Sequence, residues 1–240
     1  MASLAALDVP APQARTALSR VKKGGVLTPQ SREDVPGFTL TPQAEAMLAR
    51  GDSRIHLART MDRDDPWCLV SFSIPEAQRN VRHQLRRQLS AIGCGTVDAG
   101  LWICPAHLRG EVERILAELQ LLDRAILFTS TQPVSGVGLD KLVAQWWDLP
   151  ALAALHQGFL SAHGHRKDAA VAADAETFAA YVTAVDAWRI IPYRDPGLPA
   201  DLLPADWPGA ESRGLFTEIR RTHDEPSAAY LRQLNLTDRS

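Results

Sequence analysis

The sequence lacks the features of secreted, disulfide-bonded and membrane proteins. Its three cysteines, Cys68, Cys94 and Cys104, are odd in number and share no CxxC spacing, which argues against a disulfide framework or a zinc site. No stretch of 18 apolar residues occurs, and the N-terminus has neither a charged leader nor an apolar signal core. We therefore expect a cytoplasmic protein.

Groupings typical of catalysis are missing as well. The sequence has no Ser-His-Asp or Cys-His grouping with a recognisable elbow, and no glycine-rich phosphate loop. His163 and His165 are spaced like metal ligands, but no third ligand lies near them in sequence. We expect a protein that is not an enzyme and that holds neither a metal nor a cofactor.

Negative charge is absent from one long segment near the N-terminus. The whole chain has a net charge of −2, yet no acidic residue occurs from Val9 to Ser31. Within it, Pro12 suits the first turn of a helix, and an apolar stripe follows at Ala14, Ala17, Leu18 and Val21. The other side is polar and basic and carries Gln13, Arg15, Thr16, Ser19, Arg20, Lys22 and Lys23. This pattern fits a helix in a DNA major groove, and equally a solvated basic helix.

The segments around this helix predict a winged helix-turn-helix over residues 1–60. Ser3 to Leu7 reads as the end of a helix, and Asp8 with Val9 as a tight turn. After the basic helix we expect a strand beginning at Val26, a polar loop over 28–37, a returning strand over 38–41, and a helix from Pro42. A winged helix domain normally has one more helix before the pair, so we expect that helix to be missing or shortened.

Residues 65–132 predict a ferredoxin-like middle domain. The apolar pattern gives a strand over 67–74, a helix over 76–92, one or two strands over 94–104, a helix over 106–122 and a strand over 125–130. The first helix is basic through Arg79, Arg82, Arg86 and Arg87. These arginines are a solvated face, or form salt bridges to the helix that carries Glu111, Glu113 and Glu118, or make a second contact to DNA backbone or to an acyl-CoA phosphate.

The last part, residues 139–240, predicts a helical domain, so that the whole chain is of the α+β class. Helices are expected over 139–162, with a break at Pro150, over 175–191 and over 212–222, with a short helix in the tail. Between them, DPGLPADLLPADWPG (195–209) reads as a rigid segment anchored on apolar side chains. Four aromatic residues are either core or the lining of an aromatic ligand pocket: Trp146, Trp147, Trp188 and Tyr193.

Five segments together resemble a known family. QARTALSRVKKGG, LTPQAEAML, WCLVSFSIPEAQRNVRHQLRRQL, GLWICP and DPGLPADLLPADWPG resemble the PaaX-like transcriptional repressors of phenylacetic acid degradation, in the same order. The resemblance implies an N-terminal winged helix domain, a middle domain similar in fold to small CRISPR-associated nucleases, and a helical C-terminal domain. Because the metal ligand of those nucleases is missing here, we expect the middle domain to be a structural or dimerising domain. It also implies a homodimer that binds palindromic operator DNA and is released by an acyl-CoA, with phenylacetyl-CoA the known example.

The resemblance assigns roles to the basic helix, with the recognition helix over 11–23. It implies base-edge contacts from Gln13, Arg15, Thr16 and Ser19, and phosphate contacts from Arg20, Lys22 and Lys23. Arg32 belongs to the wing, where Glu33 and Asp34 would repel phosphate. The metal-binding aspartate of the nucleases is not present at the end of the first strand, Ser71 to Pro75. The alternative is a ligand-sensing or interaction protein whose shortened N-terminal domain impairs DNA binding.

Overall fold

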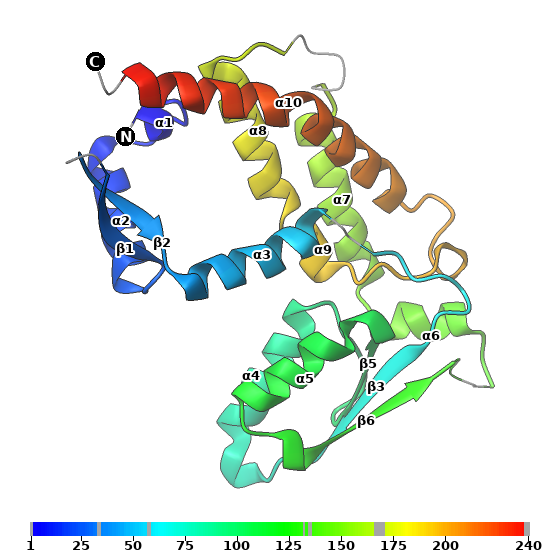
Figure 1. Ribbon diagram of the computed structural model, residues 1–240. Coiled ribbons are helices and arrows are strands. Elements are labelled where there is room, and N and C mark those ends of the chain that lie inside the picture. Colours follow the sequence, from blue (N-terminus) through cyan, green and yellow to red (C-terminus); the bar gives the residue numbers. More distant parts are fainter. Residues whose placement is uncertain are drawn as a thin grey trace. The chain divides into compact units, whose positions relative to one another are not determined.

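The computed structural model describes residues 2–32, 35–56, 59–131, 133, 136–165 and 171–237 (Figure 1). It has a mixed α/β architecture whose residues fall into two compact units. Unit 1 comprises residues 1–57, 163–187 and 214–240, and unit 2 comprises 58–162 and 188–213. No helix within the described ranges is both long enough and apolar enough to cross a membrane.

Unit 1 begins with the elements α1 (Ala2–Ala5), α2 (Ala11–Lys23), β1 (Leu27–Arg32), β2 (Val35–Leu40) and α3 (Pro42–His56). The turn between α1 and α2 lies where the sequence predicts it, with Asp8 at φ 54°. Thr41 caps α3, because its Oγ1 accepts a hydrogen bond from the backbone N–H of Ala44 at 3.2 Å. The order helix, helix, strand, strand, helix matches the sequence prediction.

The predicted polar loop over 28–37 is wrong. Most of it is strand, because β1 and β2 pair antiparallel from Leu27 opposite Leu40 to Arg32 opposite Val35. Pro29 and Pro36 hid this pattern, since proline usually interrupts strands. In a two-stranded sheet each strand has a free edge, so a residue without an N–H is tolerated there. Glu33 and Asp34, at the tip, lie outside the described residues.

Unit 2 contains the β-α-β-β-α-β order that the sequence predicts. Its elements are β3 (Trp67–Phe72), α4 (Arg79–Ala91), β4 (Gly95–Asp98), β5 (Leu101–Pro105), α5 (Arg109–Glu118) and β6 (Ala125–Ser130). Short 3-10 turns, η1 (Glu76–Gln78), η2 (Ala106–Leu108) and η3 (Leu122–Arg124), adjoin them. The four strands are antiparallel in the order β4-β5-β3-β6, the strand order of a ferredoxin-like sandwich.

Different elements pack against the two faces of this sheet. Cys68, Val70 and Phe72 of β3 join a buried core with apolar residues of α4 and α5, such as Leu85 and Ile115. On the other face, Trp67 and Ile103 pack with Val143 of α6 (Leu139–Trp146) and with the neighbouring Trp147. Gly95 of β4 permits this contact, because a Cβ there would lie 2.7 Å from the Trp147 ring. One face of the sheet is therefore covered by two helices, and the other is covered near β4 and β5.

The remaining elements are α7 (Leu149–His163), α8 (Ala175–Trp188), α9 (Ile191–Arg194), η5 (Ala200–Leu202) and α10 (Gly209–Thr237). The predicted break near Pro150 is confirmed, since α6 ends at Trp146 and Pro150 lies in the first turn of α7. The predicted separate tail helix is wrong, because α10 continues through Pro226. Buried His223 and Ser227 lie on either side of this proline, so tertiary packing holds the helix together there.

Candidate nucleic-acid interface

The basic helix α2 has well-defined ends. A proline lies in its first turn, where a missing N–H costs no helical hydrogen bond. At the other end the N–H groups of Gly24 and Gly25 donate to the carbonyls of Arg20 at 2.8 Å and Lys22 at 3.0 Å. Gly25 has φ +72°, a conformation that favours glycine. The hairpin is fixed to the C-terminal end of α2, because Thr41 Oγ1 donates a hydrogen bond to the Gly25 carbonyl at 2.7 Å.

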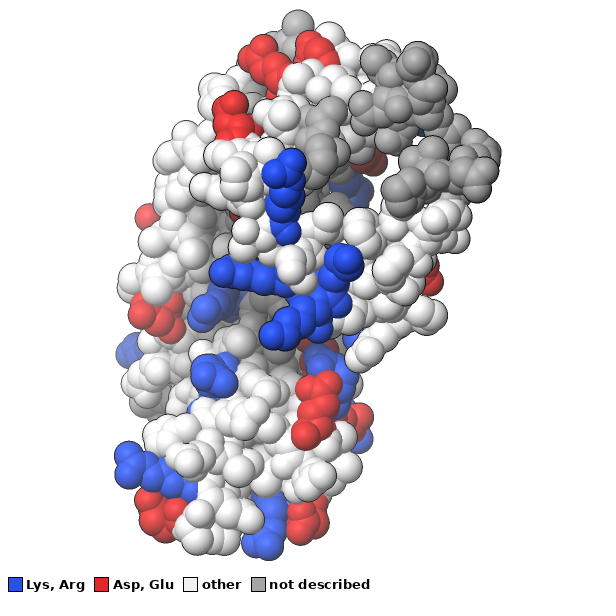
Figure 2. Space-filling view, turned by 90° about the vertical axis from the view of Figure 1, so that its left-hand side faces the viewer, with Lys and Arg blue, Asp and Glu red and all other residues white. Residues whose placement is uncertain are grey.

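The polar side of α2 faces solvent as predicted. Every residue assigned to base or phosphate contact on this helix is exposed: Gln13, Arg15, Thr16, Ser19, Arg20, Lys22 and Lys23. Figure 2 shows Lys and Arg side chains gathered on this face. Among the described residues, no ion pair or hydrogen bond engages the side chains of Arg15, Arg20 or Lys23. These cations therefore carry unopposed positive charge, which favours binding to a polyanion.

Two of the predicted contact residues have partners within unit 1. Thr16 Oγ1 donates to the Pro12 carbonyl at 2.9 Å, one turn back in the same helix. Lys22 Nζ lies 4.7 Å from the centre of the Phe38 ring on β2, a cation–π distance. This contact draws Lys22 toward the hairpin. Arg32 is the last residue of β1, and its side chain lies outside the described residues.

The apolar side of α2 is buried less than the sequence predicts. Ala14 is 1% exposed and Leu18 is half-buried, but Ala17 is exposed and Val21 is 37% exposed. Periodicity identified the correct stripe, yet α1 has only four residues and the hairpin has two strands, so little surface is available to cover it. The helix is therefore held mainly through Ala14 and its C-terminal turn.

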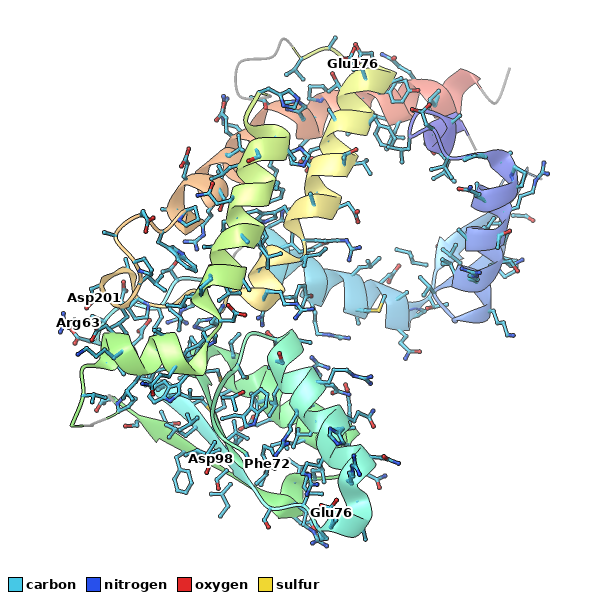
Figure 3. The ribbon with its side chains drawn as sticks, turned by 180° about the vertical axis from the view of Figure 1, so that it is seen from behind. Arg63, Phe72, Glu76, Asp98, Glu176 and Asp201 are labelled. Carbon is cyan, nitrogen blue, oxygen red and sulfur yellow. The ribbon has the colours of Figure 1, made fainter. Side chains whose placement is uncertain are left out.

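In the described part of the chain, the arginines of α4 form no ion pair with Glu113 or Glu118 of α5. Arg82 forms an ion pair at 2.6 Å with Glu76, which lies in η1 just before the helix and is labelled in Figure 3. Arg86 donates to the Ala99 carbonyl. The α5 carboxylates have partners within their own helix, since Glu113 pairs with Arg109 and Glu118 with Arg114. Of the readings that the sequence left open for these arginines, salt bridges to Glu113 and Glu118 are therefore wrong. Arg79 and Arg87 are exposed, so α4 presents a second, smaller basic face.

The four aromatic residues predicted for an effector lie in different environments. Trp147 is 6% exposed, its indole N–H donates to the Gly93 carbonyl at 2.9 Å, and its ring centre lies 6.2 Å from that of Trp146. Trp188 is 1% exposed and packs edge-on against Phe159, with ring centres 5.2 Å apart. Tyr193 is half-buried on α9. The structure therefore brings Trp146 and Trp147 together beside the sheet, whereas Trp188 packs between helices.

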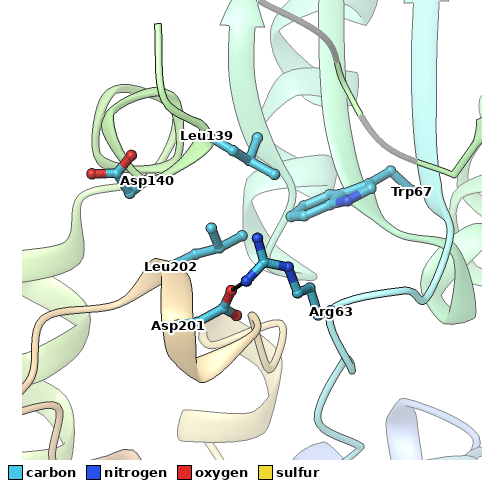
Figure 4. A pocket seen from close by; sticks show the side chains of 6 residues that line it. All are labelled: Arg63, Trp67, Leu139, Asp140, Asp201 and Leu202. Carbon is cyan, nitrogen blue, oxygen red and sulfur yellow. Dashed lines mark hydrogen bonds and ion pairs between the residues drawn. The ribbon is translucent and has the colours of Figure 1, made fainter.

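A cavity of about 340 Å³ is lined by Trp67 and by residues of two other segments. Trp67 is buried, and its ring centre is 6.1 Å from that of Trp147. Arg63 Nη1 donates to Asp201 Oδ2 at 2.8 Å within the lining (Figure 4). The lining residues are Arg63, Trp67, Leu139, Asp140, Asp201 and Leu202. Sequence reasoning missed this cavity, because its residues come from three segments distant in sequence.

A buried Ser-His-Asp chain is a second feature that the sequence did not reveal. His156 Nε2 lies 2.9 Å from Asp195 Oδ2, and His156 Nδ1 lies 2.6 Å from Ser212 Oγ. A carboxylate only accepts, so His156 Nε2–H is the donor to Asp195. His156 is 1% exposed and Ser212 is 0% exposed, so no substrate reaches the serine. The chain ties α7, the 195–209 segment and the start of α10 together, and its role is structural.

Comparisons with known proteins agree with this architecture. The family model described as PaaX protein central Cas2-like domain matches residues 60–141, and that of the PaaX-like protein C-terminal domain matches residues 147–233. The transcriptional repressor PaaX of Escherichia coli K12 is 26% identical over 212 residues, which cover 85% of this chain and 66% of the repressor.

A solved structure shows the same fold. The uncharacterized protein Rv0674 from Mycobacterium tuberculosis superposes with a TM-score of 0.61 at 23% identity, and the match covers 93% of this chain and 86% of that one. The two family models lie side by side in sequence and span the middle and C-terminal parts of the chain. The chain belongs to the PaaX-like family.

Proposed function

We propose that this protein is a transcriptional repressor that binds palindromic operator DNA as a homodimer and is released by an acyl-CoA thioester. The observation that carries the proposal is the exposed, unopposed positive charge of α2. The similarity of this chain to the transcriptional repressor PaaX of Escherichia coli supports the same class of function. We assign DNA reading to residues 1–60 as a winged helix-turn-helix, dimerisation to 65–132, and a further helical domain to 139–240.

In this proposal α2 is the recognition helix. Its exposed Gln13, Arg15, Thr16 and Ser19 would contact base edges in the major groove, while Arg20 and Lys23 would contact phosphates. Lys22 would either give up its contact with the Phe38 ring and bind a DNA phosphate, or keep that contact and hold the hairpin against α2. In a two-fold symmetric dimer the two copies of α2 would enter grooves about one DNA turn, or a multiple, apart.

Effector release would follow from differential binding. An acyl-CoA that binds one dimer geometry more tightly shifts the population toward it, and operator affinity falls if that geometry no longer matches the half-site spacing. Trp146 and Trp147 are the aromatic residues that we favour for contact with an acyl group, because they lie together beside the sheet. A thermal-shift screen with acyl-CoA thioesters tests this, since saturating ligand at 100 times its Kd adds about 2.7 kcal/mol of stability.

The DNA proposal is tested by operator binding at several salt concentrations. Arg15→Ala should cost ~1–3 kcal/mol of specific binding to the promoter beside the protein's own gene, with little effect on unrelated DNA. Lys23→Ala should weaken binding to all sequences alike and reduce the salt slope by about 1. Arg114→Ala is the matched control, because Arg114 is also helical and exposed but lies on α5. If Arg15→Ala and Lys23→Ala bind like the control, α2 is not the recognition helix.

The second candidate is a ligand sensor or interaction protein with impaired DNA binding. The exposure of Ala17 and Val21 favours it, because a recognition helix must be held firmly to place its side chains at base edges. This candidate predicts that acyl-CoA thioesters raise the melting temperature of the protein while its own promoter DNA binds no better than unrelated DNA. Specific binding to that promoter would exclude it.

A further inference from the structure

The two edges of the four-stranded sheet differ in how they are protected. Strand β4 is four residues long, has an irregular register between Thr96 and Asp98, and is contacted by α6. These are devices that natural sheets use to prevent pairing with another chain. Strand β6 has none of them, since its six residues pair in regular register with β3 and include no proline, glycine or charge. Within the described part of the chain, its outer edge pairs with no other strand (Figure 1).

The side chains beside this edge are apolar and exposed. Ala125 and Leu127 pack against the helix-covered core, so the alternating residues Ile126 and Phe128 point to the other face of the sheet. Ile126 is 62% exposed and Phe128 is 53% exposed. An open strand edge with apolar side chains beside it is a typical binding surface for another β-strand.

The chemistry of β6 makes a second copy of the same strand a suitable partner. Two β6 edges related by a two-fold axis perpendicular to the sheet would pair antiparallel, and the helix-covered faces would stay on the same side. Opposed residues must then share a face, so the two residue numbers of each opposed pair must sum to an even number. Each possible register is therefore identified by this sum. In the register with a sum of 254, Ile126 of each copy lies opposite Phe128 of the other copy, and Leu127 lies opposite Leu127 of the other copy. Sums of 252 and 256 place Phe128 opposite Arg124 and Ile126 opposite Ser130.

Charge is also compatible with this register. Arg124 would lie opposite Ser130 of the second copy, and it already pairs with Asp123 at 3.2 Å, so no like charges face each other. Six residues of strand make a small interface, in the class of weak or transient contacts. Two copies held on a two-fold symmetric DNA site would gain from such a contact through their high local concentration.

We propose that β6 is the dimerisation edge of this protein, pairing antiparallel with β6 of a second copy so that Ile126 and Phe128 stack across the axis. The partner's identity rests on the proposed homodimeric function, whereas the open edge is a property of the fold. The result is a continuous sheet of eight strands across the dimer, with the helices of both copies on the same face.

The first test measures the mass of the full-length protein over a dilution series by light scattering or sedimentation. The wild type should pass from dimer to monomer on dilution, and Phe128→Lys should stay monomeric at every concentration that gives wild-type dimer. Ile190→Lys is the matched control, because Ile190 is 45% exposed and lies outside the sheet. Circular dichroism should show that both variants fold. A wild type that stays monomeric, or a Phe128→Lys variant that dimerises normally, would overturn the proposal.

The second test fixes the register without adding a charge. The double variant Ile126→Cys/Phe128→Cys should form disulfide-linked dimers under mild oxidation with glutathione disulfide, which accepts the electrons released as each S–S bond forms. Each single variant should link poorly, because its cysteine would face an apolar residue of the second copy. The natural cysteines are all buried and should not link. Efficient linking of either single variant would refute the register, and absence of linking in the double variant would refute the edge.

Operator binding separates this proposal from the proposed function. Phe128→Lys should bind a single half-site like the wild type and lose affinity for the complete two-fold site. A protein that forms the β6 dimer but binds no operator would refute the repressor function and leave the edge assignment intact. A protein that binds the operator through a dimer insensitive to Phe128→Lys would refute the edge and leave the function intact.

Discussion

Gly197, in the 195–209 segment, occupies a position where an added methyl group has no space. Its φ is +74°, and a Cβ built there would lie 2.2 Å from the backbone oxygen of Arg59. Its own backbone is engaged on both sides, since the N–H donates to Asp195 Oδ1 at 2.8 Å and the carbonyl accepts from the N–H of Met61 at 2.7 Å. Backbone rather than a flexible side chain blocks the methyl group, so relief requires these hydrogen bonds to move.

The cost of Gly197→Ala follows from two contributions. A left-handed conformation costs an alanine about 1–2 kcal/mol relative to glycine. Displacing a backbone hydrogen bond that is buried against the neighbouring segment adds about 1–3 kcal/mol. We therefore expect a loss of roughly 2–5 kcal/mol in the free energy of unfolding of unit 2. Gly110→Ala is the control, because Gly110 lies in α5 with no atom within 4 Å of the position an added Cβ would take, and alanine there should be neutral or stabilising by up to about 1 kcal/mol.

Tryptophan fluorescence during urea unfolding measures this effect in unit 2 specifically. The sequence has six tryptophans, and all of them lie within residues 58–162 and 188–213. The midpoint of Gly197→Ala should fall well below that of the wild type with an unchanged m value, while Gly110→Ala should match or exceed the wild type. A Gly197→Ala midpoint within error of the wild type would show that the 59–61 and 197 backbones are not in the contact described.

Three further predictions concern buried groups. The thiols of all three cysteines are buried, and hydrogen bonding to Cys104 raises the pKa of Cys68. A thiol reagent should therefore label none of the three in the native protein and all three in urea. Rapid labelling of the native protein would contradict this burial. Burial and the neighbouring Asp224 raise the pKa of Tyr181 to about 12, so its phenol stabilises the fold below about pH 10 and this contribution disappears as pH rises to 12. Ultraviolet titration should show a late tyrosine signal that Tyr181→Phe removes. Ser212→Ala should cost about 1–3 kcal/mol, because it leaves buried His156 Nδ1 without its partner, and a neutral result in urea unfolding would refute the hydrogen-bonded chain.

Local patterns predicted the middle of the chain well, because its elements are marked by residues near them in sequence. The strand that begins at Trp67 and the strand Ala125–Ser130 both end at turns, and the sequence around each turn marks where the strand ends. The strand order followed from the sequence of elements, since β-α-β-β-α-β has few compact arrangements. The same patterns correctly predicted which side of α2 faces solvent, because the exposure of that side depends on the helix alone.

Prediction failed where distant packing overrides local propensity. Pro226 should end a helix, but α10 continues because His223 and Ser227, which flank the proline in sequence and share one face of the helix, are buried. The cavity beside Trp67 and the chain through His156 depend on contacts between residues 39 or more positions apart, which a single sequence does not connect. The open edge at β6 was equally invisible, because a strand's apolar side chains look the same in sequence whether they are covered or exposed.

The segment that is most distinctive in sequence and the segment that we propose to read DNA have separate physical roles. In DPGLPADLLPADWPG, Asp195 accepts from His156, Gly197 admits the 59–61 backbone, and Leu198 is 2% exposed in the core of unit 2. Each of these contacts stabilises the fold. The unopposed charge is on α2, which precedes the region that either family model matches. Fold and DNA recognition should therefore separate by mutation: Arg15→Ala should weaken operator binding at unchanged stability, whereas Gly197→Ala should lower stability without changing the operator preference of the protein that remains folded.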